Sequence, residues 1–480
     1  NDLCQKAIQQ GLRNLIAADV YVRHTGEVSF GGATRKARTK ALRELALQFP
    51  DYERDVAHFV ARDPVAAARR SLDLARLTRA AGGPDPVLFI SHSRGGGVER
   101  HIRDSIRALR KAGTGAILLR SVQGRPGELT LNTIEDLYLP NLNPVSRDGA
   151  VDGLAGILRE AGVSHIEVHN LADYPQDADR RVGDLAKALG VTYGFTVHDY
   201  LSVCPRINLI DSSGIYCGES GADACRVCLA SGEALPDGRP DITAWRDGYA
   251  TLLSGAASVR APSHDAARRI EGYFPGLSVS VHPHEERIWP PADYRLSVHQ
   301  PGEPVRVAVI GAIGPHKGSA VLLECARDAL KRELPLQFVI VGYSDRHELE
   351  KLANVTVTGR YFEQEVFDLI ARHGCHVAFL PSVVPETYSY TLSIAQAAGL
   401  PVAAFDLGAI AERLPKDGKD WLVPWDLVKQ PRKLADGLVA FGSGRDVGGD
   451  WPHADEGQGL RMACKAGTAT DETNLGIQNQ

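Results

Sequence analysis

A glutamate followed directly by the start of a helix is the first feature that could do chemistry. The segment PETYSYTLSIAQAAGLPV, residues 385–402, follows an apolar strand pattern and becomes a helix pattern near Ser389. Amide groups at a helix N-terminus favour anions, so the backbone of Ser389, Tyr390, Thr391 and Leu392 is predicted to face a diphosphate. The carboxylate of Glu386 can face the same ligand.

A glycine-rich turn, GAIGPHKG at residues 311–318, ends an earlier strand of the same region. Gly311 and Gly314 let backbone amides approach an anion, and Lys317 can neutralise phosphate. The GxGxxG spacing of dinucleotide sites is absent, so a tight turn without a ligand is the alternative. Together with the Glu386 segment, the turn predicts a phosphate site.

The first half of the chain carries two further candidates. Gly96 and Gly97 lie in SHSRGGGVERH, between a strand and a helix, where backbone can approach a ligand. His198 and Asp199 end a later strand in TVHDY, where the imidazole can hydrogen-bond a ligand or accept charge and Asp199 can orient it. A purely structural histidine is the alternative for His198.

The segment that begins at Pro385 resembles the C-terminal domain of glycosyltransferase family 4, retaining enzymes of the B-type fold. Their signature is a glutamate, seven residues and a second glutamate. Glu386 matches the first, which implies contacts with donor-sugar hydroxyls, whereas Ile394 stands at the second. Lys317 matches the family's lysine, and Ala312 stands where the family often has arginine. Arg360 is the candidate to replace that charge, and a solvated loop cation is the alternative.

The resemblance implies a nucleotide-sugar donor as co-substrate, no redox cofactor, and transfer with retention to a glycan or lipid-linked glycan acceptor. His198, Lys317 and Glu386 are the catalytic candidates. Positive charge and helix dipoles would stabilise the departing diphosphate. The implied role is a hexosyltransferase of bacterial surface polysaccharide or lipopolysaccharide synthesis. A non-catalytic sugar-binding or scaffolding module is the main alternative, because of Ile394 and Ala312, and a nucleotide-sugar epimerase is a weaker one.

Apolar strand patterns alternate with helix patterns from Pro86 onward, which indicates parallel, doubly wound sheets. The predicted fold is α/β, with two Rossmann-like domains facing a cleft (B type) after a mainly helical N-terminal segment. The predicted divisions are a helical segment at 1–83, an acceptor domain at 84–290 with a cysteine-rich insertion at 204–228, a donor domain at 291–442, and an extension, disordered in part, at 443–480.

The N-terminal residues have a resemblance of their own. Asp2, Gly11 and the run after His24 are similar to the end of a glycosyltransferase family 2 domain, in which an acidic base and a later histidine approach a metal-diphosphate. Residues 1–83 are therefore interpreted as the tail of such a domain in a tandem enzyme whose remainder lies upstream.

Four of the eight cysteines gather in the predicted insertion: Cys204, Cys217, Cys225 and Cys228. This pattern favours a structural zinc site, and buried free thiols or a redox pair are the alternatives. The remaining cysteines are interpreted as packing residues.

Composition limits the other partners. The formal net charge is -5 with 24% charged residues, which gives no basic surplus for nucleic acid. The sequence has no apolar run of about 20 residues that could span a bilayer. We therefore expect a cytoplasmic enzyme, with peripheral association at the inner face of the plasma membrane as an additional hypothesis.

Overall fold

The computed structural model describes most of the chain up to residue 447. The described residues are 2–15, 17, 20, 34–125, 127–145, 151–175, 177–211, 214–231, 241–286, 288–416, 418–445 and 447. His24 and nearly all of the predicted extension at 443–480 lie outside these residues. No helix in the described part is long and apolar enough to cross a membrane.

The chain divides into two compact units, one of residues 1–76 with 139–142 and one of residues 77–138 with 143–480. Helices make up the described structure of the first unit, as predicted: α1 Asp2–Gln9, α2 Thr34–Gln48, α3 Tyr52–Arg62 and most of α4 Ala66–Ala81. Within this unit Asp73 accepts two hydrogen bonds from Asn141, one from the amide and one from Nδ2, both 2.9 Å long.

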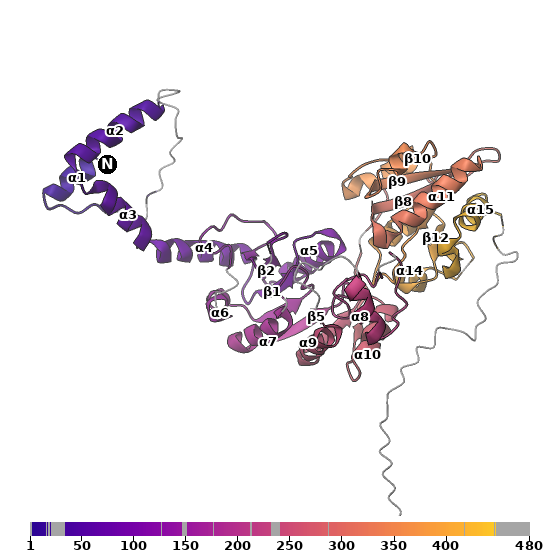
Figure 1. Cartoon of the computed structure of the whole chain (residues 1–480), viewed down its shortest axis with the longest axis horizontal. Coiled ribbons are helices and arrows are strands. Elements are labelled where there is room, and N and C mark those ends of the chain that lie inside the picture. The colour runs from indigo at the N-terminus through magenta and orange to yellow at the C-terminus, as the bar shows by residue number, and fades with distance from the viewer. Residues whose placement is uncertain are drawn as a thin grey trace, which may run out of the picture. The chain divides into compact units, whose positions relative to one another are not determined.

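The second unit begins with a sheet in the order β3-β2-β1-β4-β5-β6-β7 (Figure 1). Every pair is parallel except β2 with the edge strand β3. The strands are β1 Val87–Ser91, β2 Ala116–Ser121, β3 Leu129–Asn132, β4 His165–Val168, β5 Thr192–Thr196, β6 Ser258–Ala261 and β7 Ser280–Val281. The helices are α5 Gly96–Lys111, α6 Val151–Glu160, α7 Ala178–Leu189, α8 Ala222–Ser231, α9 Ile242–Gly255 and α10 His264–Tyr273.

A second sheet follows, in the order β10-β9-β8-β11-β12-β13 and parallel throughout. Its strands are β8 Val305–Ile313, β9 Leu336–Ser344, β10 Val355–Val357, β11 Val377–Leu380, β12 Val402–Phe405 and β13 Trp421–Val423. Its helices are α11 Ser319–Lys331, α12 Val366–Arg372, α13 Tyr390–Ala397, α14 Gly408–Arg413 and α15 Pro431–Gly442, with short 3-10 turns η2 Pro315–Lys317, η3 Leu349–Lys351, η4 Glu363–Glu365 and η5 Trp425–Lys429.

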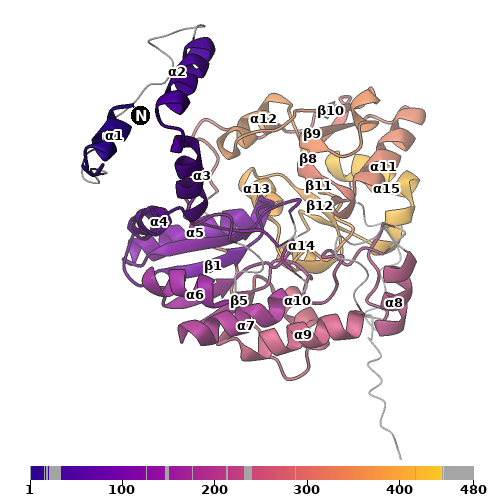
Figure 2. The same cartoon turned by 60° about the vertical axis from the view of Figure 1, so that its left-hand side comes forward.

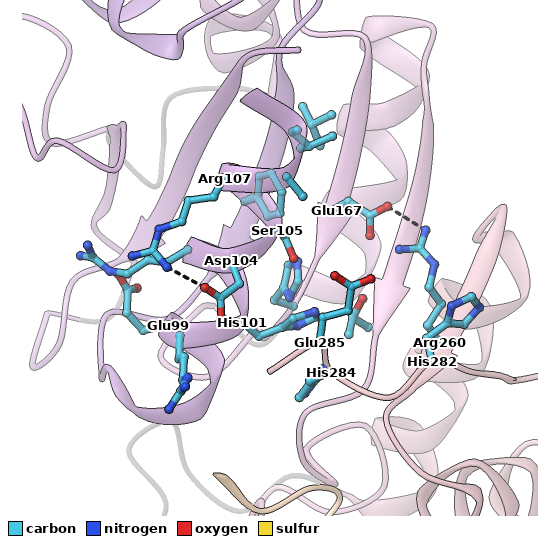
Figure 3. Close-up of a pocket in the computed structure, with 18 of the residues that line it drawn as sticks. Glu99, His101, Asp104, Ser105, Arg107, Glu167, Arg260, His282, His284 and Glu285 are labelled. Carbon is cyan, nitrogen blue, oxygen red and sulfur yellow. Dashed lines mark hydrogen bonds and ion pairs between the residues drawn. The ribbon is translucent and has the colours of Figure 1, made fainter. Parts of the chain in front are cut away.

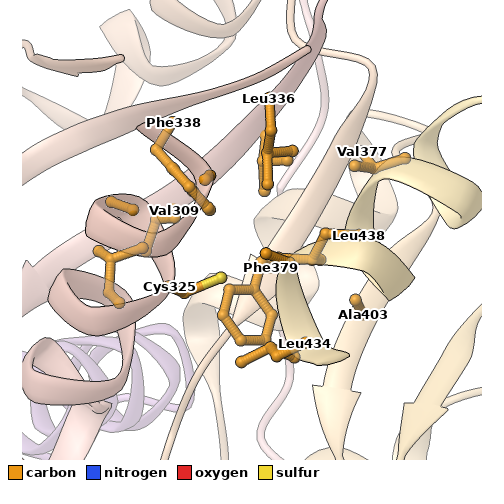
Figure 4. Packing of buried hydrophobic residues seen from close by; sticks show 14 of the residues in the cluster. Val309, Cys325, Leu336, Phe338, Val377, Phe379, Ala403, Leu434 and Leu438 are labelled. Carbon is orange, nitrogen blue, oxygen red and sulfur yellow. The ribbon is translucent and has the colours of Figure 1, made fainter. Parts of the chain in front are cut away.

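The second sheet has helices on both faces, and neighbouring residues of a strand point to opposite sides, so both sets of side chains are buried. Val307 and Val309 of β8 pack in a cluster with α11 and α15, which lie side by side on one face (Figure 2). Phe338 and Phe379 fill the centre of that cluster (Figure 4). On the opposite face, Ile310 packs in a second cluster with residues of α12, α13 and α14.

The predicted α/β fold of B type, with two Rossmann-like domains, is confirmed. The nine strands that the apolar patterns predict between Val87 and Phe405 are present, with ends that differ by up to three residues, and a short strand predicted at 17–24 lies mostly outside the described residues. The sequence interpretation did not include β3, β6, β7 and β13, each of two to four residues. These strands are too short for a two-residue alternation or an apolar run to stand out, so their pairing depends on neighbours distant in the chain.

Two glycines let the Glu386 loop lie close to neighbouring backbone. At Gly318, which follows η2, a Cβ atom would lie 1.9 Å from the carbonyl oxygen of Pro381. At Gly408, the first residue of α14, it would lie 2.6 Å from Cα of Pro385. Both have positive φ, 73° and 66°. The loop between β11 and α13 is therefore fixed by backbone on two sides.

We predict that Gly318→Ala destabilises the protein far more than Gly276→Ala. Both glycines have positive φ, so both variants bear the cost of about 1–2 kcal/mol for a side chain in the left-handed region. Only at Gly318 does the added methyl group also overlap backbone, because Gly276 has nothing within 4 Å of the Cβ position. Urea unfolding of the two variants measures the difference. Equal losses would contradict the close approach at Pro381.

Candidate functional site

Thr387 brings the predicted site residues of the two sheets together. Its Oγ1 donates a 2.6 Å hydrogen bond to the carbonyl oxygen of His198, which follows β5 of the first sheet. Its own carbonyl accepts a 2.9 Å bond from Oγ of Ser263, the N-cap of α10. The Glu386 loop and the His198 strand end therefore belong to one site, at the carboxyl ends of both sheets.

The glycine-rich turn and the Glu386 loop also meet. Nζ of Lys317 lies 3.5 Å from Oε1 of Glu386, and both side chains are mostly shielded from solvent. A Cβ at Gly311 would lie 3.1 Å from Cγ2 of Thr391, so this turn passes directly beside the first turn of α13. The turn, the lysine, the glutamate and the helix start, all predicted from sequence, thus surround one region. Gly314 stands at the start of η2 beside them.

The helix start uses one of its predicted phosphate donors internally. Ser389 is the N-cap of α13, and its Oγ accepts a 3.3 Å hydrogen bond from the amide of Leu392. That amide is already engaged, which leaves the amides of Tyr390 and Thr391 as candidates. The Tyr390 ring lies 3.2 Å from the Cβ position of Gly97, so a side chain there would crowd it. Gly97 thus allows the two domains to approach, whereas Gly96 has nothing within 4 Å of its Cβ position.

The arginine that lies against α13 is Arg100, which the sequence does not indicate, rather than Arg360, which is predicted to supply extra positive charge. Arg360 is exposed and stacks over the Tyr343 ring at 4.5 Å. Arg100 of α5 instead lies 4.5 Å over the Tyr390 ring and forms a 2.6 Å ion pair with Glu363. Arg100 is thus the arginine that the structure places against the first residue of α13.

Ile394 stands where the resemblance to family 4 implies a second glutamate, and it packs among apolar side chains. Ile394 is 5% exposed and belongs to the apolar cluster under α13. The adjacent Ser393 donates a 2.7 Å hydrogen bond to Oε1 of Glu286, and Arg413 donates a 2.6 Å bond to Ser393 Oγ. Oε2 of Glu286 is buried and has no partner among the described residues. A carboxylate therefore lies beside α13, contributed by the segment after β7.

Four histidines gather where the strands of the first sheet end. His169 follows β4, His198 follows β5, His284 follows β7, and His101 lies on α5 after β1. Nδ1 of His169 lies 2.8 Å from Nε2 of His198, and Nδ1 of His101 lies 3.4 Å from the same nitrogen. The rings of His101 and His284 have centroids 4.0 Å apart, and both line a cavity (Figure 3).

Burial keeps these rings neutral. It lowers the pKa of His101 to about 4 and the pKa values of His169 and His284 to about 3. The pKa of His198 is lowered well below its ordinary value, first by burial and then by the other rings. Charging one ring disfavours charging its neighbours, because like charges repel most strongly where water is excluded.

Asp199 is not the partner of the His198 ring. Its carboxylate accepts hydrogen bonds from Nδ2 of Asn170 at 2.5 Å and from the amide of Leu201 at 2.9 Å. Burial raises its pKa to about 6. The expectation that Asp199 orients His198 is therefore corrected, since His169 contacts the ring nitrogen instead.

An open cavity of about 1240 Å³ extends from this cluster along the first sheet. Besides the histidines it is lined by Glu167 of β4 and Arg260 of β6, which form a 2.9 Å ion pair. Figure 3 shows this pair and Glu285 around the same space as His101 and His284. The cavity offers charged and polar groups of both signs, which suits a polar ligand.

The four predicted zinc ligands lie near one another, since each of the other three contributes to the raised pKa of Cys204. Burial is the main cause, and it raises that pKa to about 12. In the described part of the chain, however, the group whose ligand atoms all lie within 4.8 Å of one another is His101, His198 and His284. Zinc at Cys204, Cys217, Cys225 and Cys228 stays a prediction.

The two sheets have the arrangement of the B-type glycosyltransferase fold. Residues 304–441 match the family model for glycosyl transferases group 1. The phosphatidyl-myo-inositol mannosyltransferase of Mycobacterium tuberculosis strain H37Rv is 35% identical over 131 residues, which are 26% of this chain and 34% of that protein. Its counterpart from Mycobacterium leprae is 34% identical over the same shares. This chain thus spans about a third of the length of these curated relatives.

Among solved structures, sucrose-phosphate synthase from Thermosynechococcus elongatus is similar with a TM-score of 0.49 and 16% identity, over 75% of this chain and 92% of that chain. A glycosyltransferase from Rickettsia africae has a TM-score of 0.47 and 14% identity, over 75% and 90% of the two chains. Similarity at this level carries no information about substrates.

The sequence interpretation missed His101, His169 and His284. His169 and His284 follow strands of a parallel sheet, and His101 lies in the helix after another. Ligands bind beyond the carboxyl ends of such strands, and this rule applies to all three residues as it does to His198. His284 follows β7, a strand of two residues that no sequence pattern reveals. Its position beyond a strand end could therefore not be predicted.

We predict that the free energy of unfolding falls as pH decreases from about 6.5 to 4. In this window the unfolded chain binds protons at the four histidines while the folded chain does not, which costs stability at about 1.4 kcal/mol per pH unit for each proton. Asp199 acts in the opposite direction, because its raised pKa lets the folded chain bind a proton between about 4 and 6. One carboxyl group offsets only one of the four histidines.

Urea unfolding between pH 4.5 and 7 measures this dependence. His101→Gln should reduce the slope by up to one proton equivalent, about 1.4 kcal/mol per pH unit. His282→Gln, which changes an exposed histidine lining the same cavity, should leave the slope unchanged. An identical slope in wild type and His101→Gln would contradict a neutral buried ring at this position.

Proposed function

We propose that this protein is a glycosyltransferase that moves a sugar from a nucleotide-sugar donor to a glycan acceptor with retention of configuration. The observation that carries the proposal is the Lys317 and Glu386 pair at the start of α13, within the region that matches the glycosyl transferase family model. Lys317 belongs to the glycine-rich turn, and Glu386 directly precedes Thr387, which hydrogen-bonds to His198 after β5 of the first sheet.

We assign a role to each site residue from its position. Lys317, beside Gly311 and Gly314, would neutralise the diphosphate, and the first-turn amides of α13 would add hydrogen bonds to the same group. Glu386 would bind hydroxyls of the donor sugar. His198 is neutral and buried, so it would hydrogen-bond the transferred sugar rather than repel positive charge that develops on it.

The acceptor would enter the cavity lined by His101, Glu167 and Arg260. We propose a glycan or lipid-linked glycan of bacterial surface polysaccharide synthesis, and a hexose as the transferred group. The Mycobacterium relatives are named for phosphatidyl-myo-inositol and mannose. A lipid-linked acceptor would bring the protein to the inner face of the plasma membrane from the cytoplasm.

A sugar-binding module without activity is the second candidate. Two observations favour it: Ile394 is buried where the family has a glutamate, and Ala312 removes an arginine from the phosphate turn. Arg100, against Tyr390, is one described cation that could compensate, and Arg413, bonded to the carbonyl of Ser389, is another. The resemblance of residues 1–83 to the tail of a family 2 domain is a separate hypothesis that applies to either candidate. Of its two named residues, Asp2 lies on α1 and His24 falls outside the described residues.

We predict that Lys317→Ala reduces sugar transfer by at least about 100-fold, because one preorganised group that stabilises transition-state charge contributes on that scale. The fold should persist, since the Lys317 side chain is partly exposed at the site rim. Transfer is measured by mass spectrometry of products with a panel of nucleotide sugars. Lys351→Ala, at an exposed lysine of η3, is the control and should keep full activity. Near-normal turnover of Lys317→Ala would refute its role.

We predict that one nucleotide sugar raises the melting temperature of the wild-type protein and not that of Lys317→Ala. A ligand at 100 times its Kd adds about 2.7 kcal/mol to the free energy of unfolding, which a thermal-shift screen detects. Stabilisation together with product formation supports the enzyme. Stabilisation with no hydrolysis or transfer for any acceptor supports the module, and no stabilisation by any nucleotide sugar contradicts both.

A further inference from the structure

Three histidines of the cluster have the arrangement of metal ligands. The ring nitrogens of His101, His198 and His284 can all lie within 4.8 Å of one another. Nδ1 of His101 and Nε2 of His198 are 3.4 Å apart. Two nitrogens bound tetrahedrally to one zinc ion at 2.0–2.1 Å are separated by about 3.3 Å. The His101 and His198 nitrogens therefore have the spacing of two ligands on one ion, and His284 offers a third nitrogen within 4.8 Å of both.

His284 supplies an independent indication that a ligand is missing. Its side chain is nine-tenths buried, and Nδ1 has no hydrogen-bond partner among the described residues. Leaving a buried polar atom unsatisfied costs about 1–3 kcal/mol, and such atoms are rare in native proteins. The ring is held by contacts with His101 at 4.0 Å and Tyr388 at 4.5 Å, so it cannot turn freely to find water.

The surroundings leave one side of the trio accessible. His101 and His284 line the large cavity, whereas His198 lies behind them at the end of β5. Two arginines that line the cavity are each paired with a carboxylate, Arg260 with Glu167 and Arg100 with Glu363, which reduces repulsion of a cation. Three imidazoles with a fourth position open to a cavity is the ligand set of a catalytic type of zinc site.

We propose that His101, His198 and His284 bind one divalent transition-metal ion of the zinc class, with its fourth position open to the cavity. Imidazole ligands favour zinc, copper, nickel or iron over magnesium and calcium, which prefer oxygen. An oxygen atom of a substrate hydroxyl or phosphate would occupy the open position. The inference goes beyond the proposed function, because the transfer described above involves no metal ion, and it assigns His198 to the ion in place of the hydrogen bond to the transferred sugar.

His169 competes with an ion for the ring nitrogen of His198. Its Nδ1 lies 2.8 Å from His198 Nε2, and its ring stacks on Phe89 with centroids 5.3 Å apart. A nitrogen lone pair either accepts a hydrogen bond or binds an ion, so an ion on His198 Nε2 displaces the bond from His169. Metal binding therefore rearranges the protons of two buried rings, and both rings stay within the cluster.

Cobalt(II) titration tests the proposal without any sugar substrate, so its outcome is separate from that of the transfer assays. The full chain is freed of metal with a chelator, dialysed, and titrated with cobalt(II) while visible absorption is recorded. One equivalent should produce the intense visible bands of low-coordinate cobalt, and zinc should remove them. His101→Gln and His284→Gln should each weaken binding by more than about 100-fold, the upper limit for the loss of an outer-shell partner.

His282→Gln is the matched control, because this exposed histidine lies two residues from His284 and lines the same cavity. It should bind cobalt as the wild type does. Circular dichroism verifies that each variant is folded. Cobalt at the cysteines would be recognised by a near-ultraviolet thiolate charge-transfer band, which the histidine site lacks. Binding that is unaffected by both His101→Gln and His284→Gln, or cobalt held by thiolates alone, or no binding, would overturn the proposal.

Discussion

The two hydrogen bonds of Thr387 are the constraint on which the site depends. Its hydroxyl reaches the carbonyl of His198 and its own carbonyl is held by Ser263, so a single residue of the second sheet is fixed to two segments of the first. Glu386, directly before it, is held from the other side, since its carbonyl accepts a 2.9 Å bond from the amide of Ala409. The distance between the two halves of the site is thereby set by short hydroxyl side chains bonded to backbone carbonyls rather than by long side chains.

Close approach of the two sheets produces two electrostatic environments within one site. At its rim, Lys317 and Glu386 remain partly accessible and form an ion pair. Deeper in the first sheet, the imidazoles lose water and stay neutral, and Asp199 resists ionisation for the same reason. A ligand that spans the site would thus meet charge at one end and neutral hydrogen-bonding groups at the other. That gradient fits a molecule with an anionic part and a part rich in hydroxyl groups.

The features of the fold and the site that could be predicted from sequence are those set by residues close together in the chain. The long apolar runs of β8 and β9 specify buried strands locally, and the residues that end them, such as Gly311, could be assigned to the cleft. The histidine cluster could not be derived in this way, because His101 and His284 come into contact only when α5 and the segment after β7 are placed in three dimensions.

The arginines show the same limit. Arg360 was predicted from its position after a strand, yet its side chain stacks on Tyr343 at the exposed edge. Arg100 could be recognised only from the way α5 faces α13, because its partners Tyr390 and Glu363 belong to the other sheet. Local patterns identify which backbone segments reach the cleft, whereas the direction of a long side chain is decided by partners far away in the sequence.

The packing of Ile394 also limits which residues this position can accept. The residue does not merely lack a carboxylate. It fills space in the apolar cluster that supports α13, together with Leu392 and Ile410. Restoring a glutamate by one substitution would place an ionised group among hydrocarbon side chains, at a cost of several kcal/mol unless those neighbours changed as well. Packing therefore excludes a carboxylate at this position unless several neighbouring residues change with it.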